Sequence, residues 1–239
     1  MAIESKKRIY YTTELEENVL NTIKTLLKKH TVFQFDASFI SFCSRKLKVS
    51  EMRICEAIYV LVKQKLIMPG SALTRSQILD NPSRALIYQT IQKQPGIHIR
   101  ELCQTLEKSV GVILAQLKVL ENFDYIRKKR YASPNLILFF QKDFPETYDD
   151  FFLVWKNENS QRIMQLLLNQ ELTLTEISTK ITLHHSTVQY HLERLENFSC
   201  IVRIPRNQAI KYTFNTTRLK LFQEFLTLYS NSVKSMKVD

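Results

Sequence analysis

Glycine is scarce in this chain of 239 residues, which has only Gly70, Gly96 and Gly111. Loops that cradle phosphate groups need clustered glycines, because the backbone must approach the ligand closely. The wide spacing of the three glycines therefore excludes a nucleotide-binding loop of that kind. The six prolines fall between segments of regular periodicity, where a missing amide donor does little harm.

Cysteine pairs and long apolar runs are also missing. Cys43, Cys55, Cys103 and Cys200 lie far apart, without a CxxC pair for zinc or redox chemistry. Because all four have apolar neighbours, we expect buried, reduced thiols. No apolar run approaches the roughly 20 residues of a membrane span, and Met1–Tyr11 does not resemble a secretory signal. We expect a cytoplasmic protein without a membrane partner.

The charge balance favours a polyanionic partner. Lysine and arginine number 34 against 23 aspartates and glutamates, a formal net charge of +11. Such an excess is common among ordinary proteins, so by itself it is weak evidence. No nucleophile-elbow or paired-carboxylate motif is present, and we expect a protein that is not an enzyme and needs no cofactor.

An internal repeat is the most informative feature of the sequence. Residues 109–122 align without a gap on residues 184–197, and both copies end in Leu-Glu-Asn-Phe, at Leu120–Phe123 and Leu195–Phe198. A repeat of this length indicates one supersecondary unit used more than once.

Each copy lies in the same predicted layout. Helical periodicity predicts helices over 83–92, 99–106 and 109–122, followed by strands over 125–131 and 136–140. The later unit repeats this order, with helices over 160–169, 174–180 and 184–197 and strands over 200–205 and 209–214. Three helices followed by a β-hairpin are the layout of a winged helix. In helix 109–122 we expect the following residues on the core face: Val110, Ile113, Leu114, Leu117 and Leu120.

The N-terminal region is a weaker copy. Helices are predicted over 15–30, 37–47 and 49–65, and only their apolar positions match the later units. The predicted fold class is mainly α with small β-hairpins, in which tandem winged helix-turn-helix units are joined by helical connectors. The expected divisions are a degenerate winged-helix-like unit at 1–80, winged helix-turn-helix units at 81–142 and 159–215, a connector helix at 143–158, and an amphipathic helix at 216–239. This last helix either closes the core of its own domain or forms a homodimer through Asn215–Val233.

The third helix of the later unit has an outer face suited to DNA. Val188, Leu192 and Leu195 are expected to face inward. A helix that enters the major groove needs short hydrogen-bonding side chains on its exposed face. The predicted contacts of this helix are His184, His185, Ser186, Thr187, Gln189, Tyr190 and Arg194, with Arg194 suited to a phosphate. Arg203, Arg206 and Lys211 in the following hairpin are expected to contact phosphates.

The run His185–Glu196 resembles the recognition helix of ArsR/MarR-type winged-helix regulators of prokaryotes, especially archaeal ones. Residues 96–102 and 112–121 resemble the same class, so the likeness covers about residues 83–214. The resemblance implies that helix three enters the major groove of double-stranded DNA and that the wing contacts its backbone or minor groove. In the earlier unit the corresponding predicted contacts are Lys108, Ser109, Gln116, Lys118, Arg127, Lys128, Lys129 and Arg130.

Metal sensing is not expected, although some members of the ArsR family carry a Cys-x-Cys. In this chain only Cys103 is present in the similar segment, and one thiolate cannot make such a site. The alternative to DNA binding is a winged-helix module for protein–protein contacts. For the N-terminal region, Phe33, Phe35, Phe39 and Phe42 form either a partner surface or simply the core.

Overall fold

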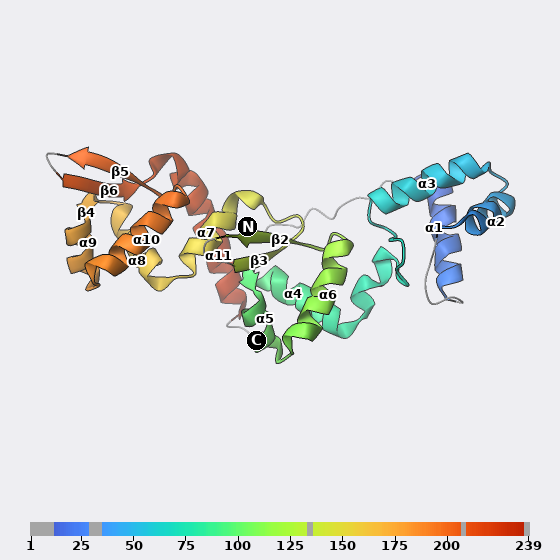
Figure 1. Ribbon diagram of the computed structural model, residues 1–239, viewed down its shortest axis with the longest axis horizontal. Coiled ribbons are helices and arrows are strands. Elements are labelled where there is room, and N and C mark those ends of the chain that lie inside the picture. Colours follow the sequence, from blue (N-terminus) through green and yellow to red (C-terminus); the bar gives the residue numbers. More distant parts are fainter. Residues whose placement is uncertain (1–11, 29–34, 133–135, 207–208, 237–239) are drawn as a thin grey trace. The chain divides into compact units, whose positions relative to one another are not determined.

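The computed structural model describes residues 12–28, 35–132, 136–206 and 209–236, with side chains in the last helix as far as Ser230. The chain divides into two compact units. The N-terminal unit comprises residues 3–92 and 97–143. The C-terminal unit comprises residues 1–2, 93–96 and 144–239. Each unit is described separately (Figure 1).

The N-terminal unit begins with three helices, α1 (Glu14–Leu27), α2 (Ala37–Leu47) and α3 (Glu51–Lys63). Thr13 and Glu16 form a capping box in which the Glu16 carboxylate accepts a 2.8 Å hydrogen bond from the Thr13 amide, which fixes the start of α1. Among the described residues that precede Ile97 no strand occurs, so these helices carry no wing. They enclose a core of their own that includes Val19, Ile23, Phe39, Cys43, Ile54, Ala57, Ile58, Leu61 and Ile67.

The rest of this unit is a winged helix. Its elements are η1 (Arg75–Asp80), α4 (Pro82–Lys93), β1 (Ile97–His98), α5 (Ile99–Leu106), α6 (Val110–Asn122), β2 (Ile126–Tyr131) and β3 (Leu136–Gln141). The antiparallel sheet has the order β1-β3-β2, and Lys128 lies opposite Phe139 in the β2–β3 register. A second core joins the helices to the sheet through Ile78, Ile87, Ile91, Ile97, Leu102, Ile113, Leu117, Leu120, Phe123, Ile126 and Phe139.

The C-terminal unit contains the second winged helix. Its elements are η2 (Glu146–Tyr148), α7 (Asp149–Trp155), α8 (Glu158–Leu167), β4 (Leu172–Thr173), α9 (Leu174–Ile181), α10 (His185–Asn197), β5 (Ile201–Arg206), β6 (Ala209–Phe214), η3 (Thr216–Arg218) and α11 (Leu219–Met236). The sheet order β4-β6-β5 repeats that of the first sheet, and Ile201 lies opposite Phe214.

An aromatic cluster joins α7 to α11 within this unit. Phe225 has its ring centroid 5.4 Å from that of Phe151, and the Trp155 and Phe222 centroids are 5.2 Å apart. All four side chains are buried. The face of α11 that carries Phe222 and Phe225 therefore closes the core of its own unit.

The predicted fold class, mainly α with small antiparallel sheets, is confirmed. The connector differs from the single helix expected over 143–158, because it consists of η2 and the seven-residue helix α7. The side chain of Asn157 ends this segment by accepting a 3.0 Å hydrogen bond from the Ser160 amide, so that α8 already begins at Glu158. The two-residue strands β1 and β4 were not predicted, since a run this short has no recognisable periodicity.

Candidate nucleic-acid interface

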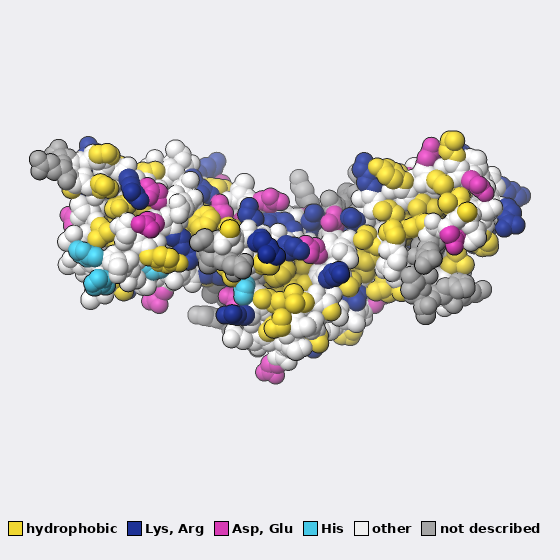
Figure 2. Space-filling view, in the orientation of Figure 1, with side chains coloured by type: hydrophobic (Ala, Val, Ile, Leu, Met, Phe, Trp, Pro, Cys, Tyr) yellow, Lys and Arg dark blue, Asp and Glu magenta, His cyan; other side chains and the backbone are white. Residues whose placement is uncertain are grey.

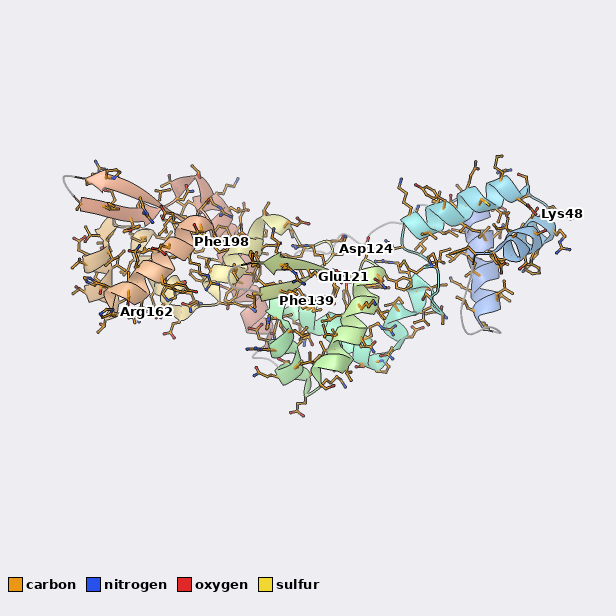
Figure 3. The ribbon with its side chains drawn as sticks, in the orientation of Figure 1. Lys48, Glu121, Asp124, Phe139, Arg162 and Phe198 are labelled. Carbon is orange, nitrogen blue, oxygen red and sulfur yellow. The ribbon has the colours of Figure 1, made fainter. Side chains whose placement is uncertain are left out.

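The turn between α9 and α10 sets the position of the candidate recognition helix. A capping box of Thr173 and Glu176 starts α9, and its backbone hydrogen bond lowers the pKa of the Glu176 carboxyl. Thr182 ends α9 in the left-handed region, with φ of 55°. The Nδ1 atom of His184 then accepts a 3.3 Å hydrogen bond from the Ser186 amide and caps α10. Arg162 of α8 supports this turn by donating a 2.9 Å hydrogen bond to the Ile181 carbonyl (Figure 3).

The inner face of α10 is apolar except for one histidine. Val188, Leu192 and Leu195 are fully buried, as predicted. His191 is also buried, and its Nδ1 atom lies 3.1 Å from the Oγ atom of Ser160 on α8. Burial lowers the pKa of His191, with a smaller contribution from the neighbouring Arg194. His191 is therefore a core residue.

The outer face of α10 presents the polar groups that the sequence predicted there. His184, His185 and Ser186 are exposed at its N-terminal end, and Tyr190 is 55% exposed. Thr187 and Gln189 are half-buried, and Gln189 donates a 2.6 Å hydrogen bond to the Glu193 carboxylate. Side chains with both donors and acceptors thus extend along the first two turns of the helix, where base edges or phosphates would be met.

Arg194 is held within the unit, although it lies one turn beyond Tyr190 on the same side of α10. Its Nη2 atom donates a 3.2 Å hydrogen bond to the carbonyl oxygen of Leu153, so the guanidinium is directed toward α7. The predicted phosphate contact would require this hydrogen bond to break.

The wing of the C-terminal unit carries its predicted cations in surface ion pairs. Arg203 lies 2.6 Å from the Glu196 carboxylate, and Arg206 lies 3.5 Å from that of Glu171. Lys211 is half-buried on β6. Exposed ion pairs of this kind contribute little stability, so either arginine can exchange its carboxylate for a phosphate at small cost. Residues 207 and 208 at the tip lie outside the described residues.

The third helix of the N-terminal unit, α6, differs from α10. Ser109 caps it through a 3.5 Å hydrogen bond from the Val112 amide, and Lys108 before it is half-buried. Val110 and Leu114 were expected in the core but are each 49% exposed. The core face is filled by Ile113, Leu117 and Leu120 instead, because positions 110 and 114 lie at the outer edge of the same helical stripe.

Gln116 was predicted as a base contact and is unavailable for one. Its Oε1 atom accepts a 3.0 Å hydrogen bond from Nε of Arg84, a buried residue of α4. The same guanidinium donates a 2.8 Å bond from Nη1 to the Ile78 carbonyl. Gln116 therefore serves to satisfy a buried arginine, while Lys118, two residues later, is exposed.

The four consecutive cations of the first wing do not all reach the surface. Arg127 is only 9% exposed, and its guanidinium lies 4.5 Å from the centroid of the Phe140 ring. The prediction of a phosphate contact is wrong for Arg127, because its guanidinium is buried against the Phe140 ring. Lys129 and Arg130 are exposed, and Lys128 forms a 2.8 Å ion pair with Glu121 of α6 (Figure 3).

The described residues also bear on the expectations for metal ions, thiols and membranes. Among the described residues, no group of three or more histidine, cysteine, aspartate or glutamate side chains could hold a metal ion. Burial raises the pKa of the Cys43 thiol to about 11 and that of Cys200 to about 12. Cys55 is exposed on α3, contrary to the expectation that all four thiols are buried. Within the described part of the chain, no helix combines the length and the apolar character that a membrane crossing requires.

Comparison with known proteins gives one family match and one curated relative. Residues 159–198, from α8 to the end of α10, match the family model described as bacterial regulatory protein, arsR family. A protein of Methanocaldococcus jannaschii, named an uncharacterized HTH-type transcriptional regulator, is 29% identical over 230 residues. The alignment covers 92% of this chain and 58% of the relative, so the chain spans less than two thirds of the relative's length.

Two solved structures show weaker likeness. Reduced HlyU from Vibrio cholerae N16961 aligns at 26% identity with a TM-score of 0.31, over 34% of this chain and 84% of that one. ScpB from Mycobacterium tuberculosis aligns at 12% identity with a TM-score of 0.24, over 63% of this chain and 97% of that one. TM-scores this low do not establish a common fold, so the winged-helix assignment rests on the element order of this chain itself.

Proposed function

We propose that this chain regulates transcription by inserting α10 into the major groove of duplex DNA, a role supported by the match of residues 159–198 to the arsR family model. The observation that carries the proposal is the outer face of α10. This face is polar and exposed at the N-terminal end of α10. In a helix-turn-helix, the N-terminal residues of the second helix are the ones that contact base edges in the major groove.

The side chains of α10 divide into two roles. Ser186 and Thr187, in the first turn, suit phosphate contacts through their hydroxyl groups and the positive end of the helix dipole. Gln189 can pair with adenine through its amide once it releases Glu193, and His185 and Tyr190 offer further hydrogen bonds to base edges. Specificity then rests on α10, and affinity rests mainly on the wings.

The wings neutralise phosphates. In the C-terminal unit the phosphates are contacted by Arg203, Arg206 and Lys211, and in the N-terminal unit by Lys128–Arg130. If five to eight phosphates are contacted, log K falls with log salt at a slope of about −5 to −7. With a winged helix in each unit, one chain engages two segments of DNA, and a homodimer through Asn215–Val233 extends the contact to a palindrome. Such a dimer would use the side of α11 opposite the buried Phe222 and Phe225.

One observation favours a second role, in protein contacts, for the first three helices. On α3, Met52 and Tyr59 are 74% and 66% exposed, and they lie two turns apart on one face. Of the candidate aromatics, Phe39 is buried in the core, Phe42 is 40% exposed, and Phe33 lies outside the described residues. If Met52→Ala together with Tyr59→Ala leaves DNA affinity unchanged but abolishes regulation of a reporter gene, this face contacts a partner protein.

The experiment that tests the proposed function is fluorescence-anisotropy binding to a pool of genomic duplex fragments at several salt concentrations. We expect a subset of fragments to bind far more tightly than the pool, with a steep salt dependence. Absence of binding even at low salt would refute DNA binding and place the protein among the winged-helix interaction modules.

A further inference from the structure

The two third helices carry opposite chemistry at equivalent positions. When residues 109–122 are aligned with residues 184–197, each polar residue on the outer face of α10 corresponds to an aliphatic or small residue of α6. In order, His185, Ser186, Thr187, Gln189 and Tyr190 correspond to Val110, Gly111, Val112, Leu114 and Ala115. The accessible stripe is thus kept, while its hydrogen-bonding groups are lost.

This aliphatic stripe is a surface and not part of the core. Val110, Val112 and Leu114 are 49%, 46% and 49% exposed, whereas Ile113 and Leu117 on the core face are buried. Val110 and Leu114 lie along one edge of the exposed face of α6, Val112 lies along the other, and the small residues Gly111 and Ala115 lie between them. An exposed helix face made only of aliphatic and small residues favours an apolar contact. Figure 2 shows hydrophobic side chains over α5 and the adjoining end of α6.

No side chain of this stripe can read a base by hydrogen bonds. Gln116, the amide nearest to it, is held by Arg84 at 3.0 Å. The Ser109 hydroxyl caps the helix by accepting a hydrogen bond from the Val112 amide. Removing Gln116 from Arg84 would leave a buried guanidinium without that acceptor, which is costly. Contacts made by this face are therefore apolar.

The surroundings of the stripe are basic. Lys118 is exposed on the same helix, and Lys129 and Arg130 are exposed on β2. The ion pair between Lys128 and Glu121 ties this strand to α6. If two copies of the chain paired through this face, each Lys118 would approach the Lys118 of the other copy. The repulsion between these positive charges makes such a dimer unfavourable. The positive charge instead complements a polyanion.

Thymine-containing DNA is a polyanion that also offers apolar groups to a helix. In the major groove, the 5-methyl group of thymine is the apolar feature of the base edges, and aliphatic side chains pack against it. We propose that α6 recognises thymine methyl groups through Val112, Leu114 and Ala115, while Lys118, Lys129 and Arg130 hold the flanking phosphates. This rests on the proposed function and assigns the two helices different reading modes, with hydrogen bonds from α10 and methyl contacts from α6.

Replacement of thymine by deoxyuridine tests the proposal, since it removes the methyl group and keeps every hydrogen-bonding atom. A duplex that binds the full chain tightly would be resynthesised with deoxyuridine in successive blocks of three base pairs, and each affinity would be measured by competition. We expect one block to weaken binding by about three- to fourfold for each methyl removed, the factor for burial of one CH₂-sized group.

The double variant Val112→Ala with Leu114→Ala assigns that block to α6. Both side chains are about half exposed, so the fold should survive. We expect the variant to bind thymine and deoxyuridine duplexes equally, while Gln165→Ala, exposed on α8, retains the full thymine preference. Equal affinity of the unaltered chain for all thymine and deoxyuridine duplexes would overturn the proposal. So would a deoxyuridine effect that the α6 variant keeps in full.

Failure of this proposal and failure of the proposed function give different results. If no unmodified duplex binds, DNA binding itself is refuted. If unmodified duplexes bind tightly but deoxyuridine has no effect, DNA binding stands and recognition of thymine methyl groups by α6 is refuted.

Discussion

The Nδ1 atom of His191 lies 3.1 Å from the Oγ atom of Ser160, and both side chains are buried between α10 and α8. Together with the buried Val188, Leu192 and Leu195, this contact holds the inner face of α10 against the core and leaves its polar face outside. A histidine within the recognition run thus has a structural role, while His184 and His185 remain at the surface.

The stability of the protein should depend on pH through His191. Burial holds the pKa of the folded state below the ordinary value of 6.5, so the unfolded chain takes up the proton first as the pH falls. The contribution of His191 to stability is therefore present above pH 6.5 and is lost as the pH falls below it. Urea unfolding between pH 7.5 and pH 5 measures this loss.

His191→Gln should flatten this dependence, since glutamine can bond to Ser160 and does not titrate. Gln165→Ala, an exposed substitution on α8 that changes no titratable group, is the control and should leave the pH dependence unchanged. Identical pH profiles for the unaltered chain and His191→Gln would contradict the assignment.

Arg194 and Arg203 should separate stability from DNA binding. Arg194→Ala removes the hydrogen bond to the Leu153 carbonyl and should lower the free energy of unfolding by about 1–3 kcal/mol, with the salt slope of DNA binding unchanged. Arg203→Ala breaks an exposed ion pair, so it should change stability by less than about 1 kcal/mol. For Arg203→Ala, the slope of log K for DNA binding against log salt concentration should become shallower by about 1. Denaturant unfolding and anisotropy titrations on both variants decide the matter, and the opposite pattern would refute both roles.

The first wing offers a similar pair. Arg127→Ala removes a buried guanidinium from the Phe140 ring and should cost about 1–2 kcal/mol of stability. Lys129→Ala, two residues away on the same strand, should leave stability unchanged. It should weaken binding by about the same factor on every DNA sequence, because a phosphate contact carries no sequence information. A loss confined to one sequence would show instead that Lys129 reads a base.

Gly96 should tolerate no side chain. Its φ is +73°, and an added Cβ would lie 2.9 Å from the Cβ atom of Phe152 within the C-terminal unit. Gly96→Ala should therefore lower the free energy of unfolding by at least about 1 kcal/mol. Gly111→Ala is the matched control, because nothing lies within 4 Å of its added Cβ and alanine favours the helix. Thermal unfolding that ranks the two variants the other way would contradict this account.

The sequence predicted the helices well, because their apolar spacing and caps are local signals. Helices 37–47 and 99–106 were predicted with the bounds that the structure has, whereas Ser109 and His184 were placed inside their helices and are the caps of α6 and α10. The contact of Gln116 with Arg84 joins residues 32 positions apart, and no local pattern indicates it. The burial of Arg127 has no such signal either, because alternation places Arg127 and Lys129 on one face of the strand and only Arg127 is buried.

The central claim is that the outer face of α10 reads bases, and the variant His185→Ala with Gln189→Ala tests it most directly. Its affinity would be measured on the tightest genomic fragment and on a duplex of scrambled sequence at the same salt concentration. Gln165→Ala, exposed on α8, is the control and should bind both as the unaltered chain does. The double variant should lose about tenfold or more on the specific fragment and little on the scrambled duplex. An equal loss on both duplexes would contradict base reading by α10.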